Sequence, residues 1–462
     1  MPRLSVLLIL LCASGVQAQA PPPAQDVEQY RAAAEMIIAA ALADSSAFER
    51  MAYFVDRYPQ RLSGSDMLER SIDWVLAELE ADGLENVRGQ EVMVPHWVRN
   101  EESLRMIAPR LEEMPLIGLG GSIGTPAGGI TASALVVRSF DELEARSDEV
   151  PGRIVVFNAP FTTYGQTVQY RVRGPVEAAR HGAVAALVRS ITPVSLQTPH
   201  TGMLRYADDV ERIPAAAITI EGAELLQRFQ DRGVPVELTL ELGAEMLPDA
   251  LSRNAIAELV GREKPEEVIV LGGHIDSWDV GQGAMDDAAG VVITWEAVRL
   301  LKDLGLRPRR TLRFIAWTNE ENGLRGAWEY RNSLDSLELA NHVFALESDS
   351  GVFEPVGIGV TASDAAFAMV KPIETLMMPL LTQSSVYETG VIRGGGGADI
   401  GPLMAEGVPG AGVNTDAERY FWYHHSEADT VDKLDPNHMA RAVAMVAIFV
   451  YVVAEMEERL PR

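Results

Sequence analysis

The residues best suited to chemistry follow an apolar, β-prone run near the middle of the chain. Residues Val268–Leu271 lead into two glycines, and His274, Asp276, Asp286 and Asp287 come soon after. In an open parallel sheet, ligands bind beyond the carboxyl ends of the strands, and imidazole with carboxylate suits zinc or a similar divalent ion. The pattern predicts a metal site, with a solvated acidic loop as the alternative.

Three later segments place further ligand-competent residues at strand ends or in loops. They are Glu320 and Glu321 after Thr311–Trp317, Asp349 after Val343–Leu346, and His424 and His425 with Asp429 close behind. Adjacent glutamates at a strand end point in different directions, so one can bind a metal while the other acts as general base. An aspartate four residues after a histidine can orient that imidazole. Each cluster alone is weak evidence, whereas four in succession favour one shared site.

The elements that would position these residues alternate between strand and helix after Asn254. This alternation is typical of βαβ units. It predicts an α/β fold with a mixed, largely parallel sheet flanked by helices. The expected strands are Val268–Leu271, Thr311–Trp317, Val343–Leu346 and one around Val408, and the expected helices are Gly290–Leu304, Asp364–Leu376, Asp399–Ala405 and Asp435–Leu460.

The region before residue 115 combines helical and strand patterns. Apolar residues at helical spacing predict helices at Asp26–Leu42 and Met67–Leu79, the second closed by Gly83. Alternating residues in Val87–Val98 and Glu102–Ile107 predict two strands that pair with each other.

The composition of the chain changes near Pro115, where glycines become frequent and short β-prone runs begin. This region is interpreted as a separate α/β module, and its His181 and His200 as ordinary histidines, because they lack partners at metal spacing. The chain is accordingly divided into a signal peptide (1–18), the first part of the catalytic domain (19–114), an inserted module (115–247) and the main catalytic domain (248–462).

Composition narrows the classes of partner and compartment. The net charge of −27 argues against nucleic acid and anionic membranes as partners, because both bind basic patches.

The apolar run Leu4–Cys12, followed by small residues up to Ala18, predicts a signal peptide cleaved near Ala18 and a periplasmic or secreted protein. A lipoprotein with Cys12 lipidated is the weaker alternative, because Leu11 stands where a small residue is needed. Cys12 is the only cysteine, so the exported chain would form no disulfide. The apolar stretch Met439–Met456 is interpreted as a buried helix rather than a membrane span.

Taken together, the motifs resemble those of the M28 family of co-catalytic zinc peptidases. The matching features are His-x-Asp at 274–276, Gly-Ala-Met-Asp-Asp at 283–287, Glu-Glu at 320–321, Asp349, and His-Ser-x-x-Asp-Thr at 425–430. The amino-acid sequences of residues 272–287 and 421–426 are most similar to those of a branch of carboxypeptidases within that family. The resemblance runs from about residue 26 to the end and includes a protease-associated-like insertion at the module that begins near Pro115.

The resemblance implies two Zn²⁺ ions per chain. Its implied ligands are Asp286 as the bridge, His274 and Asp349 on one ion, and Glu321 and His425 on the other. The spacing to the Asp-Thr pair favours His425 over His424, which stays an alternative ligand.

The resemblance also implies the supporting roles. Glu320 would be the general base that takes a proton from the attacking water. The implied supporting residues are Asp276 behind His274, Asp429 behind His425, and Asp287 beside Asp286, where members of this family often have a cis peptide bond.

For function, the resemblance implies hydrolysis of short peptides, mainly dipeptides with free termini, by a homodimer. Arg393, in the glycine-rich segment before Asp399, is a candidate for binding the substrate carboxylate by bidentate pairing. An aminopeptidase of the same family is the first alternative. A non-catalytic, receptor-like binding protein is the second, and the complete ligand set argues against it.

Overall fold

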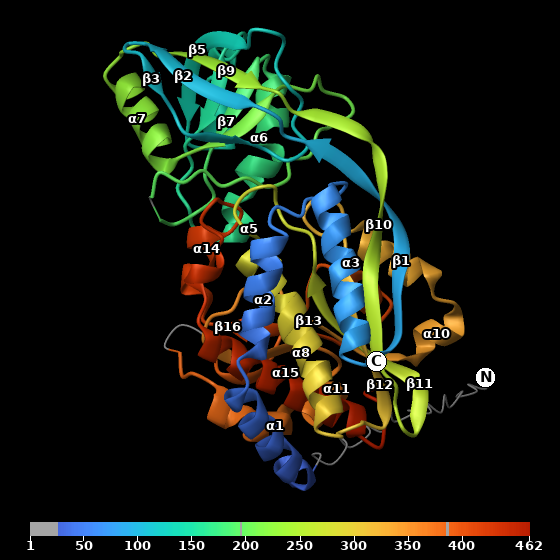
Figure 1. Ribbon diagram of the computed structural model, residues 1–462. Coiled ribbons are helices and arrows are strands. Elements are labelled where there is room, and N and C mark those ends of the chain that lie inside the picture. The colour runs from blue at the N-terminus through green and yellow to red at the C-terminus, as the bar shows by residue number, and fades with distance from the viewer. Residues whose placement is uncertain (1–25, 195, 385–387) are drawn as a thin grey trace, which may run out of the picture.

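Two eight-stranded β-sheets form the framework of the protein, seen here in a computed structural model (Figure 1). The structure describes residues 26–194, 196–384 and 388–462. The predicted signal peptide and Cys12 lie outside the described residues. The first sheet has the order β1, β10, β12, β11, β13, β16, β14, β15. Its strands are β1 (Glu85–Val98), β10 (Glu245–Leu259), β11 (Lys264–His274), β12 (Arg310–Trp317), β13 (His342–Glu347), β14 (Pro355–Thr361), β15 (Gly390–Arg393) and β16 (Gly410–Thr415).

The centre of the first sheet is parallel and lies between two layers of helices. Strands β12, β11, β13 and β16 run parallel to one another. Strand β1 pairs antiparallel with β10, β10 with β12, and β14 with β16, whereas the edge strand β15 runs parallel to β14. The larger apolar cluster packs one face of the sheet beneath α1 (Arg31–Ala43), α2 (Ser46–Arg57), α3 (Asp66–Ala81), α8 (Ala289–Asp303) and α15 (Pro436–Glu455). A smaller cluster packs the other face under α9 (Arg325–Ser333), α10 (Ser336–Asn341) and α13 (Gly401–Ala405). The predicted α/β fold with a mixed, largely parallel sheet is confirmed.

Local sequence signals account for several of these helices. The Ser65 side chain accepts a hydrogen bond from Leu68 N at the start of α3, as an N-cap residue should. Gly83 follows the helix with φ of +71°, the left-handed conformation that glycine adopts without steric cost. Helix α15 is long and apolar enough to span a membrane, yet 78% of its apolar window is buried inside the protein. The prediction of a buried helix there is confirmed.

The second sheet, which we call the second unit, is built from residues 102–242. Its order is β3, β2, β9, β5, β6, β7, β8, β4. The strands are β2 (Glu102–Ala108), β3 (Glu112–Glu113), β4 (Leu116–Gly118), β5 (Ile130–Val137), β6 (Ile154–Phe157), β7 (Ala185–Arg189), β8 (Ala215–Ile218) and β9 (Glu237–Leu242), and the longer helices are α6 (Gln169–Arg180) and α7 (Ile220–Asp231). The long strands β1 and β10 run between the two sheets (Figure 1).

The predicted pairing of Val87–Val98 with Glu102–Ile107 is wrong, although both segments are strands. Strand β1 pairs with β10 in the first sheet, and β2 pairs with β3 and β9 in the second. The chain crosses from one sheet to the other between these strands. The partner of β1 lies about 150 residues further along the chain. Local alternation cannot reveal such a distant partner.

Candidate metal centre

Three neighbouring parallel strands end at the same edge of the first sheet and present the predicted residues there. His274 is the last residue of β11, and its register partner on β12 is Trp317, three residues before Glu320. Gly272 of β11 pairs with Glu347 of β13, which ends two residues before Asp349. Parallel pairing therefore brings the carboxyl ends of the three strands together, as the sequence predicts.

Asp286 lies at the centre of this edge, with each carboxylate oxygen facing a different histidine. Its Oδ1 is 3.1 Å from His274 Nε2, and its Oδ2 is 3.2 Å from His425 Nε2. His274 Nε2 is 3.7 Å from Asp349 Oδ1, and His425 Nε2 is 3.1 Å from Glu321 Oε2. The five residues thus form two groups that meet at Asp286.

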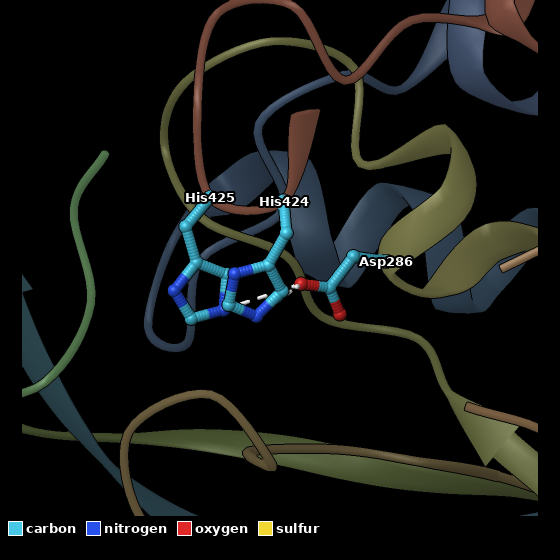
Figure 2. Close-up of side chains that lie close together, drawn as sticks. All are labelled: Asp286, His424 and His425. Carbon is cyan, nitrogen blue, oxygen red and sulfur yellow. Dashed lines mark ion pairs between the residues drawn. The ribbon is translucent and has the colours of Figure 1, made fainter. Parts of the chain in front are cut away.

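His424 and His425 both point at Asp286 (Figure 2). Their rings stack with centroids 3.5 Å apart, and His424 Nε2 is 3.5 Å from Asp286 Oδ2. Only His425 also contacts Glu321 within ion-pair distance among the described residues. Aromatic rings of Tyr164, Tyr420 and Phe421 surround His424. His425 is therefore the better placed of the two to share a cation with Glu321.

The donors at this edge fit divalent cations. Among the described residues, Glu321 Oε1 and Asp349 Oδ1 are buried and find no hydrogen-bond partner, an arrangement that is costly unless a cation binds there. The described part of the chain contains three overlapping groups of possible metal ligands, and within each group the donor atoms lie within 4.8 Å of one another. The groups are Asp286 with His424 and His425, His274 with Asp287 and Asp349, and His274 with Asp286 and Glu321. Nitrogen and carboxylate oxygen are the donors that zinc takes.

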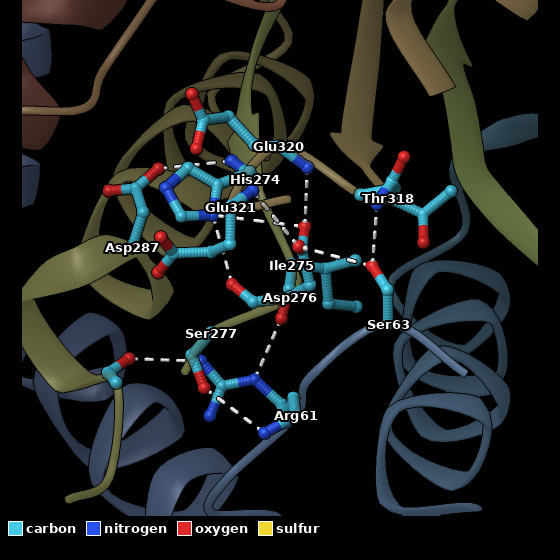
Figure 3. Close-up of polar contacts among 12 residues, drawn as sticks. Arg61, Ser63, His274, Ile275, Asp276, Ser277, Asp287, Thr318, Glu320 and Glu321 are labelled. Atoms are coloured by element: carbon cyan, nitrogen blue, oxygen red, sulfur yellow. Dashed lines mark hydrogen bonds and ion pairs between the residues drawn. The ribbon is translucent and has the colours of Figure 1, made fainter. Parts of the chain in front are cut away.

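The carboxylate of Asp276 holds the loop that carries the two glutamates (Figure 3). It accepts hydrogen bonds from the backbone N–H groups of Glu320, at 3.0 Å, and Glu321, at 3.2 Å. The backbone carbonyl oxygen of Asp276 lies 2.9 Å from His274 Nδ1, and its carboxylate Oδ1 lies 3.9 Å from the same nitrogen. Residue 276 therefore supports His274 as predicted, with the hydrogen bond made by the main chain and a longer ion pair made by the side chain.

Asp429 differs from its predicted role. Its carboxylate accepts hydrogen bonds from the backbone N–H groups of Ala284, Met285 and Asp286, at 2.8 to 3.2 Å. It therefore holds the loop that presents Asp286, and it does not orient His425. The short spacing from His425 misled the prediction, because His425 has φ of +59° and the chain turns away there.

Asp287 lies beside Asp286 across a cis peptide bond and is fully buried. Its carboxylate accepts hydrogen bonds from His274 N and Gly290 N, both at 3.1 Å. It thereby ties the end of β11 to the start of α8. Gly273 and Gly290 allow this close approach, because a Cβ on either would lie within 2.5 Å of an Asp287 oxygen.

The electrostatics of the site set Asp286 apart from the other acids, since burial raises the pKa of Glu321 to about 7 and also raises the pKa of Asp349. Burial raises the pKa of Asp286, but the hydrogen bonds from His274 and His425 outweigh it and hold that pKa well below its usual value. Burial raises the pKa of Glu320 well above its usual value, and the charges of Asp349 and Glu321 add to that effect. Asp286 is suited to stay ionised as a ligand, and Glu320 to accept a proton.

A cavity of about 550 Å³ opens over the site between the first sheet and the second unit. The first sheet contributes Asp286, Glu320, Glu321 and Asp349, the segment 420–425 contributes Tyr420, Phe421, His424 and His425, and the second unit contributes Tyr164, Arg171, Val172, Met203 and Arg205. Arg393 does not line it. That side chain is half exposed at the end of β15, where it pairs with Asp364 at 2.7 Å and stacks over Phe367. The prediction that Arg393 contacts substrate is therefore not supported by its position.

The second unit also holds the histidine pair from behind, which the sequence did not reveal. His200 Nδ1 lies 2.6 Å from the carbonyl oxygen of His424, and Thr201 N donates to the carbonyl oxygen of His425 at 2.9 Å. The Thr201 carbonyl lies 3.3 Å from His425 Nδ1. The sequence predicts an ordinary histidine at His200, because no partner stands at metal spacing, and its position beside the site depends on how the two sheets pack.

The fold and the clustered donors define a metal-dependent hydrolase of the α/β class, and the comparisons with known proteins make the family specific. Residues 254–450 match the model described as Peptidase family M28. Carboxypeptidase Q of Mus musculus is 47% identical over 441 residues, which cover 95% of this chain and 92% of the mouse protein.

Solved structures of related proteins superpose on this chain. The peptidase M28 precursor from Shewanella amazonensis superposes with a TM-score of 0.88 at 34% identity, covering 94% of this chain and 99% of that one. A zinc aminopeptidase from Bacillus subtilis shares the fold, with a TM-score of 0.67 at 19% identity, over 89% of this chain and 95% of that one. The chain belongs to peptidase family M28 and is a metallopeptidase.

Proposed function

We propose that the protein is a zinc-dependent exopeptidase that binds two Zn²⁺ ions per chain and hydrolyses short peptides, chiefly dipeptides with free termini. The observation that carries this proposal is the position of Asp286, whose two carboxylate oxygens face two separate groups of donors. His274 and Asp349 would hold one ion with Asp286, and Glu321 and His425 would hold the other. The likeness to Carboxypeptidase Q supports the choice of substrate class.

When bound, the two ions supply Lewis acidity that polarises the peptide carbonyl and makes water a stronger nucleophile. Glu320 lines the cavity next to the five ligand residues, and its backbone is fixed by the buried carboxylate of Asp276. It takes the proton from the attacking water and delivers it to the departing amine. The raised pKa of Glu320, caused mainly by burial, favours this uptake of a proton.

The second unit completes the cavity and supports the metal ligands. We assign the second unit, residues 102–242, to a protease-associated-like insertion between the two parts of the peptidase domain. These bounds differ from the expected 115–247, because β2 and β3 pair in the second sheet and β10 begins in the first sheet at Glu245. Trp278, from the loop between His274 and Asp286, packs into the apolar cluster of the second unit, and its ring lies 5.6 Å from that of His425. We further propose that the chain is exported after cleavage near Ala18 and acts as a homodimer.

Metal analysis combined with a panel of peptides tests the proposal. The purified protein should contain about two zinc ions per chain, and removal of the metal by a chelator should abolish hydrolysis of free dipeptides until zinc is restored. N-acetylated dipeptides and C-terminal amides in the same panel separate the dipeptidase from an aminopeptidase, which would accept the amide as well as the free dipeptide. A protein that binds peptides without cleaving any of them would contradict the proposal.

A further inference from the structure

Arg171 is a buried arginine of the second unit that faces the cavity without a carboxylate partner. It lies on α6, its side chain lines the cavity, and the residue is only 6% exposed. Nη1 donates to the carbonyl oxygen of Thr201 at 3.0 Å, and Nη2 donates to Tyr164 Oη at 2.9 Å. Nε is buried and has no hydrogen-bond partner in residues 26–194, 196–384 and 388–462. Among the described residues, no carboxylate lies within 4.0 Å of this guanidinium.

The other two buried arginines of the described chain are fully partnered. Arg310 pairs with Glu267 at 2.5 Å. Arg61 donates to four backbone carbonyls, among them those of Ile275 at 2.7 Å and Gly283 at 2.9 Å. Arg61 shows that neutral carbonyls can satisfy a buried guanidinium, but they do so through all three of its nitrogens. Arg171 Nε is buried without such a partner in the described chain, which is costly for a cation, so the incomplete set at Arg171 points to an anion that binds there.

The second unit is shaped to seat this guanidinium. Gly202 has φ of +133°, and a Cβ on it would lie 2.2 Å from Arg171 Cζ, so only a glycine leaves the space. Tyr164 stacks on Phe421 with ring centroids 4.8 Å apart, and this contact fixes the hydroxyl that accepts from Arg171. The surroundings of the Arg171 guanidinium are therefore built by both the second unit and segment 420–423.

The imidazole ring of His425 separates the guanidinium from Asp286. Arg171 Nη1 is 3.4 Å from His425 Nδ1, and His425 Nε2 on the far side of the ring is 3.2 Å from Asp286 Oδ2. One residue of peptide spans roughly 3.5 Å. A group one residue beyond the scissile bond can therefore reach Arg171 while the scissile carbonyl lies over Asp286.

We propose that Arg171, with the Tyr164 hydroxyl, binds the free α-carboxylate of the residue on the leaving side of the scissile bond. This inference rests on the proposed peptidase function and sharpens it, because it makes the enzyme a carboxypeptidase or dipeptidase rather than an aminopeptidase. The acids that line the cavity belong to the candidate metal centre and suit cations, so Arg171 is the buried group of the lining that suits a carboxylate. The exposed Arg205 at the cavity rim adds positive charge on the same side.

The test compares kcat/KM for alanyl-alanine and alanyl-alaninamide in the wild type, Arg171→Met and Arg171→Lys. Arg173→Met is the matched control, since Arg173 lies on the same helix, is 57% exposed and pairs with Glu177. Zinc content is measured on every preparation. The wild type should prefer the free carboxylate, and Arg171→Met should lose roughly 10- to 100-fold on the free dipeptide, the size of a charged hydrogen bond, with a change below about threefold on the amide.

Arg171→Lys should recover only part of the preference, because an ammonium cannot pair with a carboxylate through two parallel hydrogen bonds. Equal losses on both substrates, or loss of zinc, would assign Arg171 to support of Thr201 and His425 and overturn the proposal. An unchanged preference in Arg171→Met would overturn it while leaving the peptidase function intact. A wild type that hydrolyses neither substrate would overturn both.

Discussion

Asp429 offers a sharp test of how the site is held, because its carboxylate binds three successive backbone N–H groups of the loop that presents Asp286. In Asp429→Asn, the amide oxygen can keep the bonds from Ala284 and Met285, but the amide NH₂ group then faces the N–H of Asp286. One hydrogen bond to a charged acceptor is lost and one buried N–H is left without an acceptor, which together cost about 2 to 4 kcal/mol. Asp429→Ala removes all three bonds and should cost more.

Part of this cost should be seen as weaker metal binding. Residues that orient metal ligands typically contribute 10- to 100-fold to affinity, so Asp429→Asn should bind zinc roughly 10- to 100-fold more weakly than the wild type. The assay is zinc titration against a chromophoric chelator, with urea unfolding of the metal-free proteins in parallel. Asp432→Asn is the control, since that carboxylate is exposed and pairs only with neighbouring side chains. Wild-type zinc affinity in both Asp429 variants would refute the reasoning.

Three further predictions concern the frame around the site. Arg61→Lys should lower the free energy of unfolding by about 3 kcal/mol or more, because an ammonium cannot reach all four carbonyls that Arg61 binds; a change below about 1 kcal/mol in urea unfolding would contradict this. Phe449→Ala should cost about 3 to 5 kcal/mol, since Phe449 is fully buried in α15 against Phe344, whereas Leu337→Ala, at a 70% exposed position, should cost little in the same assay. Burial lowers the pKa of His342 from 6.5 to about 4, so the unfolded chain takes up a proton that the folded chain refuses. Stability should therefore fall as the pH drops from about 6.5 to about 4, by up to about 3 kcal/mol from this residue. His342→Gln should flatten that fall when unfolding is measured across the range, and an unchanged pH profile would rule His342 out as the cause.

The fold of the catalytic half could be predicted because its elements are locally encoded. The apolar run Val268–Leu271 lies inside β11, and Thr311–Trp317 and Val343–Leu346 coincide closely with β12 and β13. The sequence does not predict β14 and β15, since Pro355–Thr361 begins with proline and is interrupted by two glycines, and Gly390–Arg393 has only four residues. The expected strand around Val408 begins at Gly410, because Val408 still belongs to the turn that follows α13.

The donors of the candidate centre could be named from the sequence because each follows a strand end or a recognisable motif. What could not be predicted is which atoms support them. The carboxylates of Asp276 and Asp429 accept hydrogen bonds from backbone N–H groups rather than from histidine side chains. These contacts depend on loop conformations that residue spacing does not define. Arg171 and Thr201 reach the site only through the packing of one sheet against the other, so no spacing rule could have found them.

The most direct test of the account is the zinc content and turnover of Glu320→Gln. The amide keeps the size of the side chain but cannot take up a proton, so this variant should retain about two zinc ions per chain and lose roughly 10²- to 10⁴-fold in kcat on a free dipeptide. Loss of zinc in proportion to loss of turnover would show that Glu320 is a ligand and that the roles assigned to the two adjacent glutamates are wrong.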